Sequence, residues 1–384
     1  MARIGFLYSD MTITTPPMTS INQVKRKHVL RRTYWHSCSF HSSILSRRVP
    51  KKGPYKTRSH ASHPSNCSVQ HGPEVNLTFL QEWNVESHLA LMKKFNISKS
   101  ILSISSPGTS LTPGDNAAAR SLTRQCNDYA SKLCAQHSSL GFWASLPLPN
   151  VEDALKELTY ALDTLKADGV TMESNHHGTY LGDSSLATVF DELNRRHARV
   201  FIHPTSPCMK SCHGHGPTPA ATLTQFPNPM FEFMFDTVRA VINLFYTGTI
   251  ARCPNIIFII PHAGAALPPI IERFTAFSSL IGGAQTISTE DVKDAFANQF
   301  YFDLAGCPFP DQIWGLLRYV GTARLLYGSD YPFTPQPAVA MLAMRMAAEM
   351  KSVWSKEERR AILVRNARKL LSKRDSCKRD SCKL

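Results

Sequence analysis

Three apolar runs in the sequence end in a polar side chain that can bind a metal or move a proton. The runs read VFIHPTSP, FIIPHAGA and LLYGSDYPF, and their polar residues are His203, His262 and Asp330. Two imidazoles and a carboxylate are suitable ligands for zinc or a similar divalent ion. Taken alone, each residue could have a structural role instead of binding a metal. A histidine after a strand often caps the strand or lies in the core, and Ser-Asp can form a turn. The same placement at three run ends favours a shared functional site.

A fourth apolar run, GVTMESNHHG, ends in a pair of histidines, His176 and His177. Either ring could line the same site, and both could equally belong to an ordinary loop. The sequence leaves these alternatives open.

The elements that position these residues are short apolar runs alternating with amphipathic stretches of helical length. From about residue 82 this alternation predicts repeated β/α units. Predicted strands cover residues 99–105, 140–148, 169–175, 198–204, 255–264, 300–306 and 324–333. Predicted helices cover residues 85–98, 116–137, 151–167, 184–197, 231–248, 267–283 and 310–321, and two more follow up to about residue 371.

The pattern predicts an α/β fold, a (β/α)8 TIM barrel. In such a barrel the carboxyl ends of the strands converge on one mouth, which would bring His203, His262 and Asp330 together. The predicted strands are one short of a barrel, so the first strand has to come from upstream. We expect residues 1–81 to form a basic, irregular extension that replaces this strand, residues 82–371 to form the barrel, and residues 372–384 to form a solvated tail.

Charge is distributed very unevenly along the chain. Of the formal net charge of +14, residues 1–73 carry +11, because they hold twelve Lys and Arg residues and one acid, Asp10. The remainder is close to neutral, as in an ordinary soluble protein, so the charge gives little support for nucleic-acid binding by this part of the chain. A hydrophobic content of 43% over 384 residues is enough for a substantial core.

The cysteines and the hydropathy exclude several further classes. The ten cysteines contain no CxxC pair, which argues against a zinc ribbon or a redox motif. Cys208 and Cys212 precede an HGH triplet, but no second ligand pair follows at finger spacing, so loop residues are the preferred interpretation. No apolar run approaches the ~20 residues of a membrane span. We expect a cytosolic protein without a membrane partner, and the Arg/Ser-rich start leaves a mitochondrial transit peptide as the alternative.

Several longer segments resemble a known family. FIHPT, PHAGAALPPIIERF and YGSDYPFTP, with ESHLALMKKFNISKSILSISSPG upstream, resemble the metal-dependent decarboxylases of the amidohydrolase superfamily. That family includes the aminocarboxymuconate semialdehyde decarboxylases, and the segments are most similar to the fungal 6-methylsalicylate decarboxylases of polyketide pathways. The resemblance covers about residues 82–371.

The resemblance implies roles for four residues. His203 and Asp330 would be metal ligands. His262 would be the acid/base group beside the metal, and Asp330 would also be a catalytic residue. Arg273 would reach the substrate carboxylate across a homodimer interface, although an ordinary residue on a helix surface is an equal alternative. The implied cofactor is one divalent ion, zinc by family expectation, since GVTMESN has no lysine to bridge two metals.

The reaction implied is the non-oxidative decarboxylation of a small aromatic acid, 6-methylsalicylate to m-cresol, in secondary metabolism. A cation would organise the anionic substrate, and a neighbouring acid/base group would handle the proton.

One part of the family pattern is missing. The resemblance implies an HxH or ExH ligand pair at the end of the first strand, in a phrase such as IDVHxHFxPP, and the chain has no such phrase. His36 and His41 are five residues apart, so they do not share one face of a strand. Codon degeneracy allows the segment from Thr33 to Arg47 to be read one base out of frame as RIGIHAHFIPPFYR. We therefore hypothesise that about residues 33–80 are translated in the wrong frame, through a mispredicted intron or a frameshift.

Two alternatives to the decarboxylase remain open. One is a hydrolase of the same superfamily that acts on a lactone or an amide. The other is an inactive chain, because a polypeptide without the first-strand ligands would hold a metal ion weakly.

Overall fold

The computed structural model describes the strand at 2–9 and residues 83–209, 218–220, 223, 225–280 and 286–372. Its main sheet has the order β1-β2-β3-β4-β7-β10-β11-β12. The strands are β1 (Ala2–Ser9), β2 (Ile97–Ile104), β3 (Leu140–Ser145), β4 (Gly169–Glu173), β7 (Arg199–His203), β10 (Ile257–Ile260), β11 (Phe300–Asp303) and β12 (Leu325–Leu326). Two short hairpins, β5 (Asn175–His176) with β6 (Thr179–Tyr180) and β8 (Cys208–Met209) with β9 (Thr218–Pro219), lie outside it.

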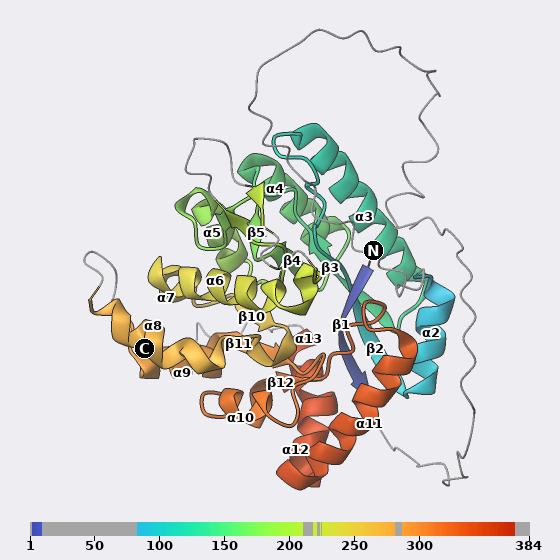
Figure 1. Cartoon of the computed structure of the whole chain (residues 1–384). Helices are drawn as coiled ribbons and strands as arrows, with labels where there is room; N and C mark the ends of the chain where they lie inside the picture. The colour runs from blue at the N-terminus through green and yellow to red at the C-terminus, as the bar shows by residue number, and fades with distance from the viewer. Residues whose placement is uncertain are drawn as a thin grey trace, which may run out of the picture.

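From β2 to β12 every neighbouring pair of strands is parallel. These are the seven strands that the apolar runs predict, so that part of the sequence analysis is confirmed. The runs are continuous, as in IFII of β10, because a parallel strand is covered on both faces. The curled parallel sheet with helices around it is a TIM-barrel-like α/β fold (Figure 1).

β1 differs from the expectation of an irregular segment over residues 1–81. It is a strand, and it pairs antiparallel with β2, from Ala2 opposite Ile104 to Ser9 opposite Ile97. Among the described residues, no pairing joins β12 to β1, so the sheet is not closed there by a ladder. The rest of residues 1–82 and the predicted tail beyond Ser372 lie outside the described residues.

Most of the helices lie around the outside of the sheet (Figure 1). The helices are α2 (Val85–Lys94), α3 (Asn116–Gln136), α4 (Val151–Thr159), α5 (Ala187–Arg195), α6 (Glu232–Tyr246), α7 (Thr249–Arg252), α8 (Ile271–Ser278), α9 (Thr289–Gln299), α10 (Gln312–Leu316), α11 (Gln336–Val353), α12 (Lys356–Arg360) and α13 (Asn366–Leu371). α9 is not among the predicted helices, although the reciprocal capping box of Ser288 and Asp291 marks its start. Among the described residues no helix is long and apolar enough to cross a membrane.

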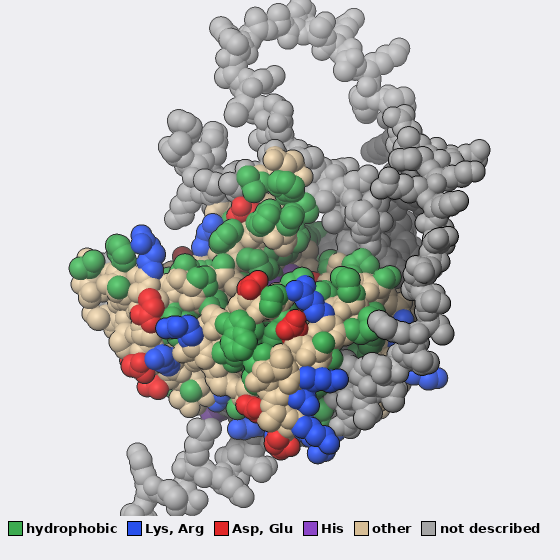
Figure 2. All heavy atoms as spheres, turned by 60° about the horizontal axis from the view of Figure 1, so that its bottom comes forward, with side chains coloured by type: hydrophobic (Ala, Val, Ile, Leu, Met, Phe, Trp, Pro, Cys, Tyr) green, Lys and Arg blue, Asp and Glu red, His purple; other side chains and the backbone are tan. Residues whose placement is uncertain are grey.

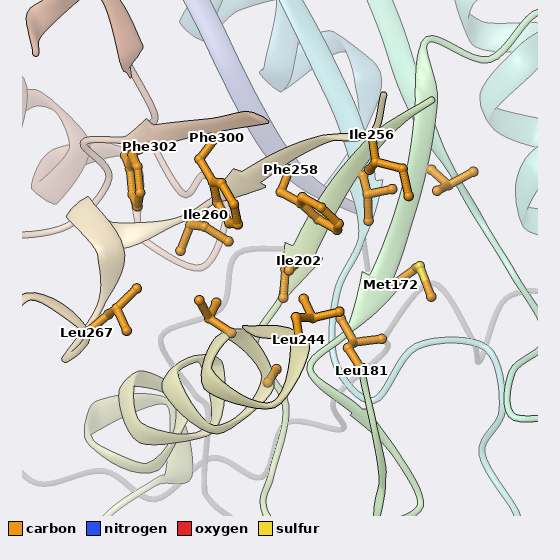
Figure 3. Close-up of a cluster of buried hydrophobic side chains, with 14 of the residues drawn as sticks. Met172, Leu181, Ile202, Leu244, Ile256, Phe258, Ile260, Leu267, Phe300 and Phe302 are labelled. Atoms are coloured by element: carbon orange, nitrogen blue, oxygen red, sulfur yellow. The ribbon is translucent and has the colours of Figure 1, made fainter. Parts of the chain in front are cut away.

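The sheet buries apolar side chains on both faces. Alternation along β7 places Val200 and Ile202 in the large outer cluster and Phe201 in a smaller inner one. The outer cluster packs β7, β10 and β11 against α6, where Leu244 lies (Figure 3). The inner cluster fills the curl of the sheet with Ile101, Trp143, Phe201, Ile257, Ile259, Tyr301, Leu326, Ala367 and Leu370.

α13 covers the amino-terminal ends of the strands. Arg199, the first residue of β7, donates to the Ser372 carbonyl at 2.7 Å, and Asn366 donates to the carbonyl of Leu325, the first residue of β12, at 2.8 Å. The carboxyl ends of the strands lie at the opposite end of the curl. Barrels of this kind have their functional sites at that end. On the face shown in Figure 2, acidic and basic side chains are interspersed among apolar ones.

Phe300 tests the packing of the outer cluster. Its ring is fully buried and lies 5.2 Å from the Phe258 ring and 5.1 Å from the Phe296 ring, measured between centroids. Phe300→Ala should lower the free energy of unfolding by about 3–5 kcal/mol, through lost burial and the cavity left behind. Urea unfolding measures this change. Phe277→Ala, at a ring that is 45% exposed, is the control, and an equal loss in both variants would contradict the assignment.

Candidate functional site

A layer of buried polar side chains lies at the carboxyl ends of the strands, inside the curl. Side chains two residues apart on a strand point to the same side, so the residues that follow the inner apolar cluster also face inward. Four polar residues lie two positions after a member of the inner apolar cluster: Ser103 after Ile101, Ser145 after Trp143, His203 after Phe201, and Asp303 after Tyr301. Glu173 pairs in register with His203 and joins the layer. All five polar residues are at most 5% exposed.

His203 ends β7 and is completely buried. Its Nδ1 lies 2.5 Å from the Pro204 carbonyl oxygen and 3.2 Å from Glu173 Oε2. Metal-binding histidines commonly donate one ring N–H to a carbonyl or carboxylate in this way, which fixes the ring and directs the other nitrogen to the metal. The surroundings of His203 therefore suit the ligand role that the sequence predicts, with Nε2 as the coordinating atom.

Glu173 was missed by the sequence analysis, which noted only that the run lacks a lysine. A signal was present, because Glu173 ends the run GVTME as His203 ends RVFIH. The sequence does not show which residue this acid contacts, because Glu173 and His203 lie on two different strands that become neighbours only in the folded sheet.

His262 follows β10 in a backbone conformation that non-glycine residues seldom adopt. Its φ is +57°, and those of Ala263, Gly264 and Ala265 are +52°, +82° and +56°. Consecutive left-handed residues carry strain, which is tolerated where surrounding bonds hold it. Those bonds come from Asp303, whose Oδ1 accepts from His262 N at 3.0 Å, and from Gln312, which donates to the His262 carbonyl at 2.6 Å.

Asp330 lies in the turn after β12 and also has a left-handed backbone, with φ at +56°. Thr334 N donates to its carbonyl at 2.8 Å, which holds the turn closed. The turn packs against the end of β11, because a Cβ added at Gly328 would lie 2.9 Å from Asp303 Cγ. Asp303 thus touches the backbone of His262 on one side and the turn that carries Asp330 on the other. The structure brings the ends of β10, β11 and β12 together through this residue, which the sequence analysis did not single out.

Arg273 lies on the exposed side of α8, away from this layer. Its guanidinium group lies 4.8 Å from the centroid of the Phe277 ring. The predicted contact with a substrate carboxylate requires a second subunit, and it stays a prediction.

The two histidines of the fourth run lie on the β5–β6 hairpin and its turn. His176 is buried, and its Nε2 has no hydrogen-bond partner among the described residues. His177 Nε2 lies 3.2 Å from Ser110 Oγ. Of the zinc-knuckle segment, Cys208 is in β8, while Cys212 and the HGH triplet lie outside the described residues.

The described residues do not make a complete metal site. Within them no group of three His, Cys, Asp or Glu side chains could hold a metal ion. β1, with the sequence ARIGFLYS, contains none of these residue types, and His36 and His41 lie outside the described residues. The hydroxyls of Ser145, in the polar layer, and of buried Thr171 have no hydrogen-bond partner in the described part of the chain.

The fold and these motifs match known proteins. An amidohydrolase family model matches residues 66–373. The chain belongs to this family. A decarboxylase of Aspergillus niger is 36% identical over 299 residues, covering 76% of this chain and 79% of the relative. The 6-methylsalicylic acid decarboxylase of Penicillium expansum is 33% identical over 265 residues, covering 68% of this chain and 78% of the relative.

Solved structures of the family confirm the predicted fold class. The crystal structure of an amidohydrolase II protein is 34% identical and superposes with a TM-score of 0.68, covering 76% of this chain and 90% of that one. A dihydroxybenzoic acid decarboxylase from Polaromonas, solved with bound manganese and 2-nitroresorcinol, has a TM-score of 0.62 at 18% identity, covering 76% of this chain and 87% of that one. That enzyme holds a divalent metal on the same fold.

The buried ring of His176 predicts a pH dependence of stability. Burial lowers its pKa from 6.5 to about 3, so the folded protein keeps the ring neutral while the unfolded chain protonates it below about pH 6.5. The free energy of unfolding should therefore fall as the pH drops from about 6.5 toward 3, with a loss of about 2 kcal/mol between pH 7 and pH 5 from this residue. Urea unfolding at both pH values measures the loss.

His176→Gln should remove that part of the pH dependence. His137→Gln, at the half-buried C-cap of α3, is the control and should keep it. Identical pH slopes in the wild type and the His176 variant would contradict the role of this ring.

Proposed function

We propose that this protein is a carboxy-lyase that decarboxylates a small aromatic acid without oxidation, and that its substrate is 6-methylsalicylate, converted to m-cresol in fungal polyketide metabolism. The observation that best supports this proposal is the position of three residues at the carboxyl ends of parallel strands in one curled sheet. They are His203 at the end of β7, His262 after β10 and Asp330 after β12. The relatives that match most of the chain are named decarboxylases, and two of them are named for 6-methylsalicylic acid. The ring substituents of the substrate are proposed from the names of these relatives.

The chemistry requires one bond to break and one to form. The bond between the ring carbon and the carboxyl carbon breaks, CO2 leaves, and the same ring carbon takes up a proton. We assign the proton transfer to His262, whose ring lies on a strained loop that Asp303 and Gln312 hold in place. The Gly306 backbone approaches this ring, since a Cβ added there would lie 3.3 Å from His262 Nδ1. A larger residue would displace the acid/base group.

The assay of this proposal uses 6-methylsalicylate with CO2 release and m-cresol formation as the two readouts. In the chain with the frame restored over residues 33–80, His262→Asn should lower kcat by about 100-fold or more, because general acid/base groups contribute factors of this size. His137→Gln, at the other end of the strands, should keep the wild-type rate. An active wild type whose His262 variant is equally fast would contradict the assigned role.

The same assay separates the alternatives. Turnover of a lactone or amide, with no CO2 from any salicylate, would favour a hydrolase. No turnover of either substrate class would favour the inactive chain.

Metal dependence is the second part of the proposal, with zinc as the proposed ion and manganese as the alternative. When bound, a divalent ion would hold the substrate carboxylate and its ortho oxygen. His203 and Asp330 are the described donors, and a tight site requires more ligands than these two. We propose that the missing pair belongs to the phrase IHAHF, which codons compatible with residues 33–47 can yield when they are read one base out of frame.

Metal analysis tests this part directly. The chain with the present sequence should purify with less than about a tenth of an equivalent of zinc or manganese, whereas a chain with the frame restored over residues 33–80 should hold about one equivalent. Genomic and transcript reads across the segment are the matching genetic test. Full metal occupancy in the present chain, or none in the restored chain, would refute the reading-frame hypothesis.

Assembly and location complete the proposal. We propose a cytosolic homodimer in which Arg273 contacts the substrate of the partner subunit. Support comes from the exposed apolar side chains beside it on and after α8, Phe277 and Leu280, which are 45% and 75% exposed. The five described cysteines, Cys126, Cys134, Cys208, Cys253 and Cys307, are free, which fits a reducing compartment.

A further inference from the structure

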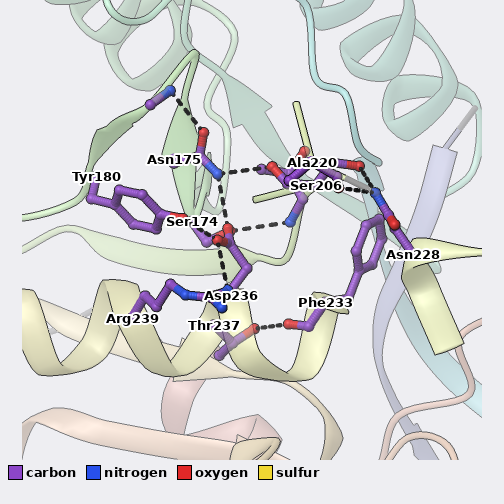
Figure 4. A network of polar contacts seen from close by, with 12 residues as sticks. Ser174, Asn175, Tyr180, Ser206, Ala220, Asn228, Phe233, Asp236, Thr237 and Arg239 are labelled. Carbon is purple, nitrogen blue, oxygen red and sulfur yellow. Dashed lines mark hydrogen bonds and ion pairs between the residues drawn. The ribbon is translucent and has the colours of Figure 1, made fainter. Parts of the chain in front are cut away.

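A buried carboxylate outside the curl of the sheet anchors the ends of β4 and β7. Asp236 lies on α6 and is completely buried. Its Oδ2 accepts hydrogen bonds from Ser174 Oγ and, at 2.9 Å, from Asn175 Nδ2, and its Oδ1 accepts one from Tyr180 OH. Arg239, one turn further along α6, lies 3.6 Å from Oδ1. Figure 4 shows these side chains converging on Asp236.

The residues that bind Asp236 also hold the chain around His203. Ser174 N donates to the His203 carbonyl at 2.8 Å, and Ser174 Oγ accepts from Thr205 N at 3.1 Å. Asn175 Nδ2 also donates to the Ser206 carbonyl at 3.1 Å. The backbone on both sides of His203 is therefore fastened to the segment after β4, and that segment is fastened to Asp236.

The same anchor fixes Glu173. Neighbouring residues on a strand point to opposite faces, so Ser174 turns outward to Asp236 while Glu173 turns inward. There its carboxylate lies 3.2 Å from His203 Nδ1. A shift of Ser174 would move both partners of this contact.

A carboxylate suits this position better than an amide. Ser174, Asn175 and Tyr180 present three donors, and two carboxylate oxygens can accept all of them. Burial and the neighbouring carboxylate raise the pKa of Tyr180 above its usual value, so its phenol keeps the proton that it donates. Asparagine at 236 would offer one acceptor oxygen and turn two N–H donors toward groups that already donate, which leaves buried donors unsatisfied.

We propose that Asp236 is a positioning residue, which holds His203 and Glu173 in their working orientation through Ser174, Asn175 and Tyr180. The effect on turnover rests on the proposed decarboxylase function. The effect on the His203 ring does not, so one experiment can separate the two.

The experiment compares Asp236→Asn with Thr237→Val. Thr237 is the next residue on α6, is equally buried, and donates its hydroxyl to the Phe233 carbonyl of its own helix at 3.0 Å. The protein is labelled with ¹⁵N-histidine, and the His203 ring signals are assigned with His203→Gln. Asp236→Asn should shift or broaden the His203 Nδ1 signal, and Thr237→Val should leave it unchanged at a comparable loss of stability.

Turnover of 6-methylsalicylate is the second readout. A positioning role predicts about a 10-fold or greater fall in kcat/KM for Asp236→Asn, carried mainly by kcat, in the range found for residues that orient a metal ligand. Tyr180→Phe removes one donor, keeps the carboxylate, and should give a smaller change in the same direction. This variant decides the question if Asp236→Asn does not fold.

The outcomes are distinct. An Asp236 variant, or Tyr180→Phe in its place, that loses stability but keeps the His203 signal would overturn the proposal and leave Asp236 a structural residue. A shifted His203 signal supports the proposal even where wild-type protein decarboxylates no salicylate, a result that would instead contradict the proposed function.

Discussion

The register of the parallel strands is the constraint on which the candidate site depends. Side chains on a strand alternate between the two faces, so a slip of one residue in β7 would turn His203 out toward the helices and bring Ile202 into the curl. The pairing of Glu173 with His203 and of Asp303 with Leu326 fixes this choice. The two apolar clusters enforce it, because each strand buries one set of side chains inside and another outside.

Two buried carboxylates hold the segments that follow the strands in fixed positions. Asp303 binds the backbone of the strained His262 loop and packs against the turn before Asp330. Asp236 fastens the ends of β4 and β7 from the helical side. A left-handed backbone at a non-glycine residue costs about 1–3 kcal/mol, and charge-assisted hydrogen bonds offset costs of this size. The backbone around His203, His262 and Asp330 is therefore held by neighbouring carboxylates.

The direction of β1 differs from that of the other strands of the main sheet. A parallel first strand would carry its last residues to the mouth, where the family resemblance implies a ligand pair. β1 runs the other way, so its amino end, at Ala2, lies level with Ile104 at the carboxyl end of β2. Its sequence offers no ligand at either end. The strand pairs with the edge of β2, because hydrogen bonding between strands requires no particular side chains.

The sequence by itself determined the seven parallel strands and the residues that end them, because doubly covered strands are continuous apolar runs and a polar side chain at their end is easy to see. It also determined the family, through the motifs around His203, His262 and Asp330. α9 was predictable from its capping box but lacked a neighbouring motif to draw attention to it. Only the tertiary structure decided the direction of β1, the contact of Glu173 with His203, and the hydrogen bonds of Asp303 and Asp236. Each of these depends on partners from distant elements, and local sequence patterns do not record which strands and helices will meet.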